Sequence, residues 1–467
     1  MSARQLTTGS IPGHVRAIAL PASLGLIFQT MYNVVDSFYA GKISTEALAA
    51  MGVGFPVFLL VVATGSGLSR GASALLANAI GAGNREEQSR YATQALSLAV
   101  VAAVALTIIG FATGPALFRF LGAEGEYLDL ALRYMRPIFG GAIFFVLTSL
   151  ANAMLVASGD SKTYSRVLIS GFFANLILDP WFLYGGFGLP PMGIAGIAWA
   201  TVLVQFVGSS YLLSVVARRR LLTGSDGEGS SQKLSLQAFV PNLKTYGQIL
   251  QQAIPATFNI LSVALGFFAI NYFIKSFGKP TVAAFGVTTR IEQIALMPTF
   301  GLSASIMALV GQNNGAEDYT RVRESMRVCI TAGLILSLTT SAIIFVFARP
   351  LLRLFTADVE VIDIGEHYIH IMMPVLWSYV MTGGHVAFLQ ATKRPMYGFF
   401  ESPLRKVLLP APLMWLGVHQ LNYGIDAVWY SVAGINVLMT VITVVYARRV
   451  MNRTGNEPDS ESPQRPG

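Results

Sequence analysis

The chain of 467 residues is 53% hydrophobic and only 12% charged, with a mean hydropathy of +0.57. Soluble domains carry about 25% charged residues, so this composition excludes an ordinary soluble globular protein. The net charge of +8 does not indicate a nucleic-acid partner here, because basic residues in an apolar chain mark the cytoplasmic loops of membrane proteins. A single cysteine, Cys329, excludes an intrachain disulfide framework and a multi-cysteine metal site.

Apolar runs long enough to cross a bilayer recur along the whole chain. Because a membrane helix needs about 20 apolar residues, we read about twelve spans. They lie near 15–40, 47–78, 91–117, 130–157, 163–185, 192–217, 246–275, 281–311, 325–348, 362–391, 396–418 and 425–448. The sequence therefore predicts an all-α polytopic membrane protein.

Positive charge orients these spans. Lys and Arg gather in the termini and the even-numbered loops, as in Arg218-Arg219-Arg220 and Arg448-Arg449. The positive-inside rule then places both termini in the cytoplasm. The polar start of the chain lacks the apolar stretch of a cleavable signal peptide, so we expect the first helix to direct insertion into the bilayer.

Composition also divides the chain into five parts. We expect a cytoplasmic N-terminus over 1–14, an N-terminal lobe over 15–217, a cytoplasmic linker over 218–245, a C-terminal lobe over 246–450 and a disordered cytoplasmic tail over 451–467. The Gly- and Ser-rich stretch from Leu222 to Ser235 is typical of a flexible linker.

The two lobes are an internal duplication. One constant offset aligns Pro21 with Pro255, Gly67-Leu68-Ser69 with Gly301-Leu302-Ser303, Gly81 with Gly315, Tyr134 with Tyr368, and Ala157 with Ala391. An even number of spans in each repeat keeps both in the same orientation. The repeats are then related by an axis along the membrane normal, with a transport path at their interface.

Two acids inside apolar runs are the main candidates for function. Asp36 follows Gln29 and Asn33 at helical steps in the first span, which predicts one shared face pointing into the lobe. Asn175 and Asp179 lie one turn apart on the fifth span, directly before Pro180. A carboxylate at that depth costs roughly 2.5–3.5 kcal/mol or more, so such residues are rare unless they have a function.

Neutral oxygens complete this candidate site. Asn152 on the fourth span and Thr201 on the sixth are placed to join the carboxylates. The resulting oxygen cluster suits a proton or Na⁺, so Asp36 and Asp179 are the candidate Na⁺ ligands and no other metal site is expected. A helix-capping or paired role explains one such acid equally well, but two acids in one half favour an ion site.

Other charged residues have structural explanations. Arg290 and Glu292 in the eighth span are expected to form an ion pair, with substrate contact as the lesser alternative. Glu401, Arg405 and Lys406 compensate one another, and Arg70 is expected to extend toward the cytoplasm. His385, beside a Gly-Gly pair, is a candidate titrating group but lacks a metal-ligand spacing. Together with Gln29 and Asn33 it is a candidate substrate, cleft or structural residue.

Ordered motifs over nearly the whole chain resemble the multidrug and toxic compound extrusion (MATE) family. In the first half they are Asn33-Val34-Val35-Asp36-Ser37, Ala79-Ile80-Gly81-Ala82-Gly83, Ser158-Gly159-Asp160-Ser161-Lys162, Asn175-Leu176-Ile177-Leu178-Asp179-Pro180, and the stretch from Gly193 to Thr201. In the second half they are Arg290-Ile291-Glu292 and Gly311-Gln312-Asn313-Asn314-Gly315-Ala316. The chain looks most like the DNA-damage-inducible branch.

The resemblance implies two pseudo-symmetric six-helix lobes around a central V-shaped cleft. It implies a secondary active antiporter, not an enzyme, without a cofactor, that exports cationic or amphipathic drugs in exchange for H⁺ or Na⁺. In that branch the ion site corresponds to Asp36, Asn152, Asn175, Asp179 and Thr201. The expected setting is the bacterial inner membrane, and the expected state is a monomer.

Two alternatives remain open from the sequence. A flippase for lipid-linked oligosaccharides shares this architecture, but it needs a basic cleft for which Arg70 and Arg290 give little support. An integral membrane enzyme acting on lipid phosphates needs clustered aspartates or a His/Asp motif, which the sequence does not show.

Overall fold

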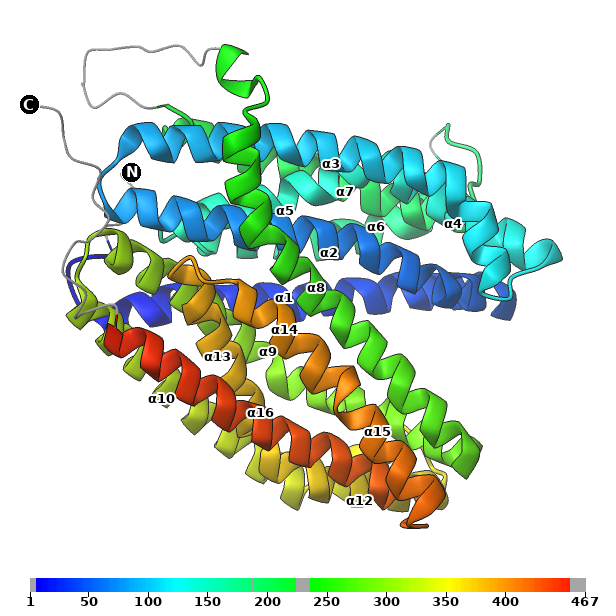
Figure 1. The fold of residues 1–467 in the computed structure, drawn as a ribbon. Coiled ribbons are helices and arrows are strands. Elements are labelled where there is room, and N and C mark those ends of the chain that lie inside the picture. Colours follow the sequence, from blue (N-terminus) through cyan, green and yellow to red (C-terminus); the bar gives the residue numbers. More distant parts are fainter. Residues whose placement is uncertain (1–5, 187, 224–235, 454–467) are drawn as a thin grey trace, which may run out of the picture.

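A computed structural model describes residues 6–186, 188–223 and 236–453, and these residues fold into helices joined by short connections (Figure 1). Within this described part, nine helices are long and apolar enough to cross a membrane, or up to eleven if each of two bent pairs is one span. The remaining predicted span corresponds to the segment 396–420, which two π-helical turns interrupt.

The N-terminal half contains seven helices that cover the six predicted spans. They are α1 (Ile11–Ile43), α2 (Thr45–Gly81), α3 (Arg85–Phe120), α4 (Gly125–Gly140), α5 (Ala142–Ala157), α6 (Lys162–Tyr184) and α7 (Ile194–Arg218). Helices α4 and α5 form one bent pair, with a 50° change of direction. The bend follows Pro137 and falls at Gly141, a combination that commonly breaks a helix.

The C-terminal half repeats this order with more interruptions. It consists of η1 (Leu236–Phe239), α8 (Leu243–Ile274), η2 (Lys275–Phe277), α9 (Lys279–Gly315), α10 (Tyr319–Val346), α11 (Ala348–Arg353), α12 (Val359–Met372), η3 (Met373–Val375), α13 (Trp377–Ala391), α14 (Met396–Pro403), η4 (Leu404–Leu408), α15 (Pro410–Trp415), η5 (Leu416–Gln420) and α16 (Asp426–Arg453). Helices α12 and α13 form the second bent pair, at 46°.

Equivalent helices in the two halves begin in the same way. The side chain of Asn84 accepts a hydrogen bond from the backbone N–H of Glu87 and caps α3. The side chain of Asp318 accepts one from the N–H of Arg321 and caps α10. Such a cap satisfies a backbone donor that the first turn leaves free. The duplication predicted from the sequence therefore extends to the helix ends.

Glycines allow the two halves to meet along α1, α2, α8 and α9. A Cβ atom built on Gly81 of α2 would lie 1.8 Å from the carbonyl oxygen of Gln312, and one on Gly315 of α9 would lie 2.0 Å from that of Asn78. Nearer the middle of the same helices, a Cβ atom on Gly67 would lie 3.0 Å from the Ala253 carbonyl oxygen of α8. One on Gly301 would lie 2.4 Å from the Ala19 carbonyl oxygen of α1. Only glycine permits backbones to approach this closely.

Amide side chains join the halves at the same end of the molecule. The Asn78 side chain donates to the Ala391 carbonyl at 2.8 Å, and the Gln312 side chain donates to the Ala157 carbonyl at 2.6 Å. The offset that aligns Gly81 with Gly315 also relates these two bonds. We call the region around Asn78, Gly81, Gln312 and Gly315 the closed end.

Away from the closed end the two bundles diverge, which gives the molecule the shape of a V (Figure 1). Helices α2 to α7 form one arm, and α9 to α16 form the other. Helices α1 and α8 run where the two arms face each other. The predicted fold, two pseudo-symmetric helical lobes in a V-shaped arrangement, is confirmed.

Several described residues of the predicted N-terminus, linker and tail pack against the helices or extend them. The backbone N–H of Leu6 donates to the Gln312 side chain at 3.0 Å, so the chain packs against α9 before α1 begins at Ile11. The predicted tail begins too early, because α16 continues to Arg453. Leu222 in the predicted linker is buried, and its carbonyl accepts from Ser89. Most of that linker, 224–235, and residues 454–467 lie outside the described residues.

Candidate functional site

The strongest candidate site is a hydrogen-bonded carboxylate pair between α1 and α6. Asp36 projects from α1, while Asn175 and Asp179 project from the same face of α6, four residues apart. The Asn175 amide nitrogen donates to Asp36 Oδ1 at 2.5 Å and to Asp179 Oδ2 at 2.9 Å. Asp36 is 4% exposed and Asp179 is 0% exposed. One amide thus bridges the two buried acids.

Pro180 interrupts the hydrogen bonding of α6 beside this pair. Pro180 has no N–H, so the carbonyl of Leu176, four residues earlier, loses its helical donor. The Tyr39 hydroxyl of α1 lies 3.5 Å from that carbonyl and donates to it. The interruption in α6 therefore becomes a second contact with α1, one turn of α1 beyond Asp36.

Helix α7 contributes a hydroxyl to the same site. Thr201 is buried and donates to Asp36 Oδ2 at 3.3 Å, while it also lies 3.1 Å from the Ile197 carbonyl of its own helix. The predicted role of Thr201 as an oxygen close to the acids agrees with this position. The three helices α1, α6 and α7 thus surround the two carboxylates.

Several oxygens around the acids have no hydrogen-bond partner in the described part of the chain. They are Asp179 Oδ1, Asn175 Oδ1 and the Tyr32 hydroxyl oxygen, all of them buried. Tyr32 of α1 and Tyr134 of α4 lie within electrostatic range of both acids. Buried polar atoms normally have partners, so these oxygens are the atoms of the cluster that can still accept a hydrogen bond or contact a cation.

The chemistry of such a pair favours uptake of a cation. Two adjacent buried carboxylates repel each other unless a proton or cation lies between them. The oxygens from carboxylate, amide and hydroxyl groups are the hard ligands that a proton or Na⁺ accepts. The arrangement can therefore change charge as the access to it changes.

Three other predicted residues form no hydrogen bond with the two acids in the described part of the chain. Asn152 of α5 is half-buried, and its amide oxygen has no partner in the described chain. Gln29 is half-buried and Asn33 is exposed, and in the described residues neither forms a hydrogen bond with the two acids. A step of three residues turns a helix by about 300°, which leaves Asn33 about 60° away from Asp36. Tyr32, four residues before Asp36, lies closer in angle and is the residue that faces the acids.

The expected ion pair between Arg290 and Glu292 does not form. Arg290 is exposed, and a step of two residues places it on another side of α9 from the buried Glu292. The Tyr368 hydroxyl of α12 donates to Glu292 Oε2 at 2.8 Å instead. The sequence held a signal for this contact, because Tyr368 aligns with Tyr134, which lies near the acids of the other lobe.

His385 belongs to a different environment. It is buried in α13, and its Nδ1 atom lies 2.7 Å from the Met381 carbonyl of the same helix. It contacts neither carboxylate of the cluster in the described chain. Its position is that of a hydrogen-bonded residue within the C-terminal lobe.

A sequence model of one known family matches both halves of the chain. The MatE model matches residues 21–181 and again residues 255–416, which is the duplication seen in the fold. The chain is 30% identical over 351 residues, 75% of its length and 73% of the relative's, to a protein named probable multidrug resistance protein NorM from Thermotoga maritima.

Two further relatives have names that state different activities. The chain is 29% identical over 439 residues, 93% of each chain, to a protein named FAD transporter from Shewanella oneidensis. It is 27% identical over 376 residues, 80% of its length and 79% of the relative's, to the probable multidrug resistance protein YoeA of Bacillus subtilis.

Solved structures share the fold. A crystal structure titled MATE in complex with MaD3S superposes with a TM-score of 0.88 at 24% identity, over 98% of this chain and 100% of the other. A structure titled as the outward-facing conformation of a multidrug resistance MATE family transporter superposes with a TM-score of 0.86 at 24% identity, over 97% and 99%.

These matches exclude one of the alternatives that the sequence left open. The family is one of transporters, and one relative is named FAD transporter, so an integral membrane enzyme acting on lipid phosphates is excluded. With a family match over both lobes and a buried carboxylate pair in the first, this chain belongs to the MatE family of multidrug and toxic compound extrusion transporters.

Proposed function

We propose that this protein is a secondary active antiporter that exports cationic or amphipathic compounds in exchange for H⁺ or Na⁺. The observation that carries the proposal is the Asp36–Asn175–Asp179 cluster, in which one amide joins two buried acids of different helices. A buried acid pair that exchanges a cation changes the local charge by one unit. Such a change is large enough to bias two arrangements of packed helices.

In this mechanism the ion and the drug favour different shapes of the N-terminal lobe, so binding of one disfavours binding of the other. A cation or proton bound at Asp36 and Asp179 lowers the negative charge of the pair by one unit and permits α1 to pack more closely on α6. Pro21 supplies the point at which α1 bends, because it removes one helical hydrogen bond. The resulting change in the lobe releases the drug to the outside.

The proposed setting follows from the charge of the loops and from the bacterial relatives. We place the chain in the bacterial inner membrane as a monomer, with both termini in the cytoplasm. The closed end then faces the cytoplasm, because the N-terminal segment packs there against α9. In this orientation the two arms of the V diverge toward the outside.

Transport by the purified protein in proteoliposomes tests this proposal. The measurement is efflux of ethidium, driven separately by an imposed pH gradient and by an imposed Na⁺ gradient. Asp36→Asn or Asp179→Asn should abolish the gradient-driven efflux, because neither amide exchanges a charge. The gradient that drives the wild type identifies the coupling ion.

A matched control separates a specific effect from a general loss of charge. Asp129→Asn removes an exposed acid of α4 that pairs with Arg133 one turn away. This variant should transport as the wild type does. Gradient-driven efflux of wild-type rate in both Asp36→Asn and Asp179→Asn proteins would rule out the proposed coupling site.

A further inference from the structure

One contact of the closed end departs from the symmetry of the duplication. Asn78 and Gln312 lie at equivalent positions, and the side-chain amide of each donates to a backbone carbonyl of the opposite lobe. The Asn78 side-chain oxygen accepts in turn from the Asn314 side chain at 2.6 Å. The residue of the first half that is equivalent to Asn314 is Ile80, which has no side-chain donor for the oxygen of Gln312.

The start of the chain supplies the missing donor. The backbone N–H of Leu6 donates to Gln312 Oε1 at 3.0 Å, and the Gln312 Nε2 atom donates to the Ala157 carbonyl at 2.6 Å. Because the two ends of a planar amide are fixed relative to each other, holding its oxygen also directs its nitrogen. A backbone donor before α1 therefore orients the amide that joins the two lobes.

Residues 6–10 are anchored at this place by the second lobe. The Arg321 side chain of α10 donates to the carbonyls of Leu6 and Gly9 at 3.3 and 3.2 Å. Asn313 of α9 also donates to the Leu6 carbonyl, at 3.4 Å. The residue equivalent to Arg321 in the first half is Glu87, whose carboxylate cannot donate to a carbonyl. The second lobe thus carries an anchor that the duplication does not repeat.

Leu6 also fills the space between the lobes. Its side chain is 0% exposed, and it belongs to a buried apolar cluster that contains Ala74 and Val156 of the first lobe and Met307 and Met326 of the second. Separation of the lobes at the closed end divides this cluster and exposes part of its apolar surface. Burial of Leu6 therefore adds to its hydrogen bond in favour of the closed arrangement.

The equivalent segment of the second half lies elsewhere. Val240, which is equivalent to Leu6, is 62% exposed. The Gln94 side chain of α3 donates to the carbonyls of Ala238 and Val240, and it accepts from the N–H of Asn242. Residues 236–242 are therefore held on α3 of the first lobe rather than at the amides that join the lobes.

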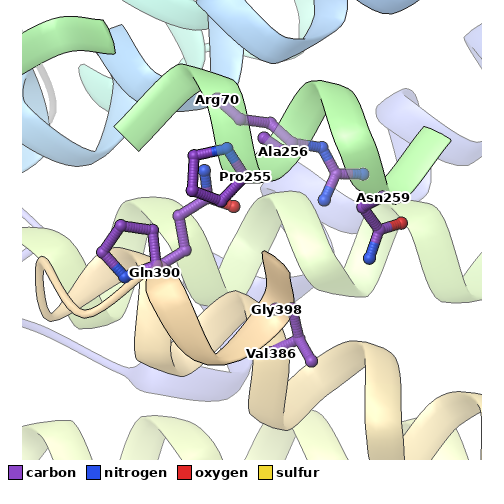
Figure 2. A pocket seen from close by; sticks show the side chains of 8 residues that line it. Arg70, Pro255, Ala256, Asn259, Val386, Gln390 and Gly398 are labelled. Atoms are coloured by element: carbon purple, nitrogen blue, oxygen red, sulfur yellow. The ribbon is translucent and has the colours of Figure 1, made fainter. Parts of the chain in front are cut away.

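Packing beside α8 also differs from packing beside α1. Arg70 and Gln390 line a small hollow between α2, α8, α13 and α14 (Figure 2), and Pro395 lines it as well. The residue equivalent to Pro395 is Ser161, whose hydroxyl donates to a carbonyl of α1 at 2.8 Å. The start of the chain is thus bonded to the first lobe through Ser161 and to the second lobe through residues 6–9. A segment that holds the two lobes together needs such contacts on both sides.

We propose that residues 6–10 form a latch that holds the closed end shut. The Leu6 N–H orients Gln312 toward Ala157, and Arg321 keeps the latch on the second lobe. Loss of the hydrogen bond to Gln312 favours the arrangement in which the lobes part at this end. The latch contributes to the balance between the two arrangements whether or not an ion or a drug is bound, which goes beyond the proposed exchange.

Removal of the Leu6 N–H tests the latch. Leu6→Pro removes this donor and keeps an apolar side chain. Spin labels attached after Glu86→Cys and Thr320→Cys, in a Cys329→Ala background, report the distance between the lobes by double electron–electron resonance in nanodiscs. We expect the ratio of long to short distances to rise about fivefold, the effect of losing one hydrogen bond. An unchanged distance distribution would contradict the proposal.

A double-mutant cycle shows whether Leu6 acts through Gln312. Gln312→Leu removes the amide and should also favour the long distances. Leu6→Pro combined with Gln312→Leu should favour them no more than Gln312→Leu does alone, because the two residues serve one contact. Additive effects would show that Leu6 contributes packing alone and would overturn its role as the orienting donor.

Arg321→Gln tests the anchor, and it serves if Leu6→Pro does not fold. This change releases the Leu6 and Gly9 carbonyls and should raise the fraction of long distances. Arg323→Gln, which changes an exposed arginine of the same helix, is the matched control and should leave the distances unchanged. An equal effect of the two changes would assign the shift to lost positive charge and not to the latch.

Rescue by a side chain tests the need for a donor. Ile80→Asn gives the first half the amide that Asn314 provides in the second. In the Leu6→Pro background it should return the distance distribution toward that of the parent protein, because the oxygen of Gln312 again has a donor. Absence of any recovery would overturn the requirement for a donor at this oxygen.

Discussion

At the scale of single residues, the candidate site depends on which atoms face the two acids. Asn175 provides both hydrogens of its amide, one to each carboxylate, so its nitrogen is fully used while its oxygen is free. Thr201 is the third contact, and it supplies a hydroxyl at 3.3 Å from Asp36. The hydroxyl is the contact that can be removed with the smallest change in shape.

Thr201→Val should reduce coupled transport without abolishing it. A single hydrogen bond contributes about 1 kcal/mol, which corresponds to roughly a fivefold slower gradient-driven ethidium efflux. Thr289→Val is the control, because the Thr289 hydroxyl donates within its own helix to Phe285. Transport at the wild-type rate in Thr201→Val would show that α7 does not take part in the ion site.

Much of this site was predictable, because the helical spacing of its residues and their positions within apolar runs can be read from the sequence. Asp36, Asn175 and Asp179 lie within apolar runs, and their helical steps place them on defined faces. The partner across the lobe is harder to predict, since the rotation of α1 decides whether Asn33 or Tyr32 faces inward. Packing against α6 fixes that rotation, and a single sequence contains no record of it. The contact between Tyr368 and Glu292 depends on packing in the same way.

At the scale of the helices, carbonyls that lack a helical donor because of a proline contact side-chain hydroxyls from neighbouring elements. Pro21 removes the donor for the Ala17 carbonyl in α1. The Ser161 hydroxyl, just before α6, lies 3.4 Å from that carbonyl and 2.8 Å from the Ile18 carbonyl, to which it donates. The bendable part of α1 is therefore tied to the start of the helix that carries Asp179.

Ser161→Ala should loosen α1 around Pro21. Loss of the hydroxyl removes its hydrogen bond to the Ile18 carbonyl and its contact with the Ala17 carbonyl, at a cost of about 1 kcal/mol. We expect faster amide hydrogen exchange in the segment 17–25, measured by mass spectrometry on the protein in nanodiscs. Ser170→Ala removes a hydroxyl that bonds only within exposed α6 backbone, so its exchange in this segment should remain that of the wild type. Equal exchange in both variants would separate Ser161 from the motion of α1.

At the capped starts after Asn84 and Asp318 the predicted spans begin at 91 and 325, six residues after α3 and α10 begin, because the polar first turns lie outside the apolar runs. Irregular helices were not predicted. The bends between α4 and α5 and between α12 and α13, and the π-helical turns at Leu404–Leu408 and Leu416–Gln420, lie inside apolar runs. Hydropathy measures only how apolar a segment is, so it is insensitive to how the backbone is wound.

At the scale of the whole molecule, the two lobes meet through reciprocal contacts at the closed end. Each lobe presents one glycine to the backbone of the other, and each donates one amide hydrogen bond across the interface. Alternating access requires these contacts to separate when the other side of the protein opens. The stability of the closed end therefore sets the balance between the two states.

Gly81→Ala and Gly315→Ala should each shift the protein away from the closed arrangement. The added methyl group at either position would lie within 2.0 Å of a backbone oxygen of the other lobe, which requires the lobes to move apart. Spin labels attached after Glu86→Cys and Thr320→Cys, in a Cys329→Ala background, report the separation by double electron–electron resonance. Both labelled positions are exposed and lie in the first turns of α3 and α10.

The expected result is a longer mean distance between the labels in each glycine variant. Gly286→Ala is the control, because nothing lies within 4 Å of a Cβ atom added there. Its distance distribution should match that of the parent protein, and its only expected effect is a small gain in helix stability. Since the two close contacts are related by the internal duplication, the two glycine variants should open the interface by similar amounts. A longer distance in only one of the two variants would show that the two glycine contacts do not stabilise the closed end equally.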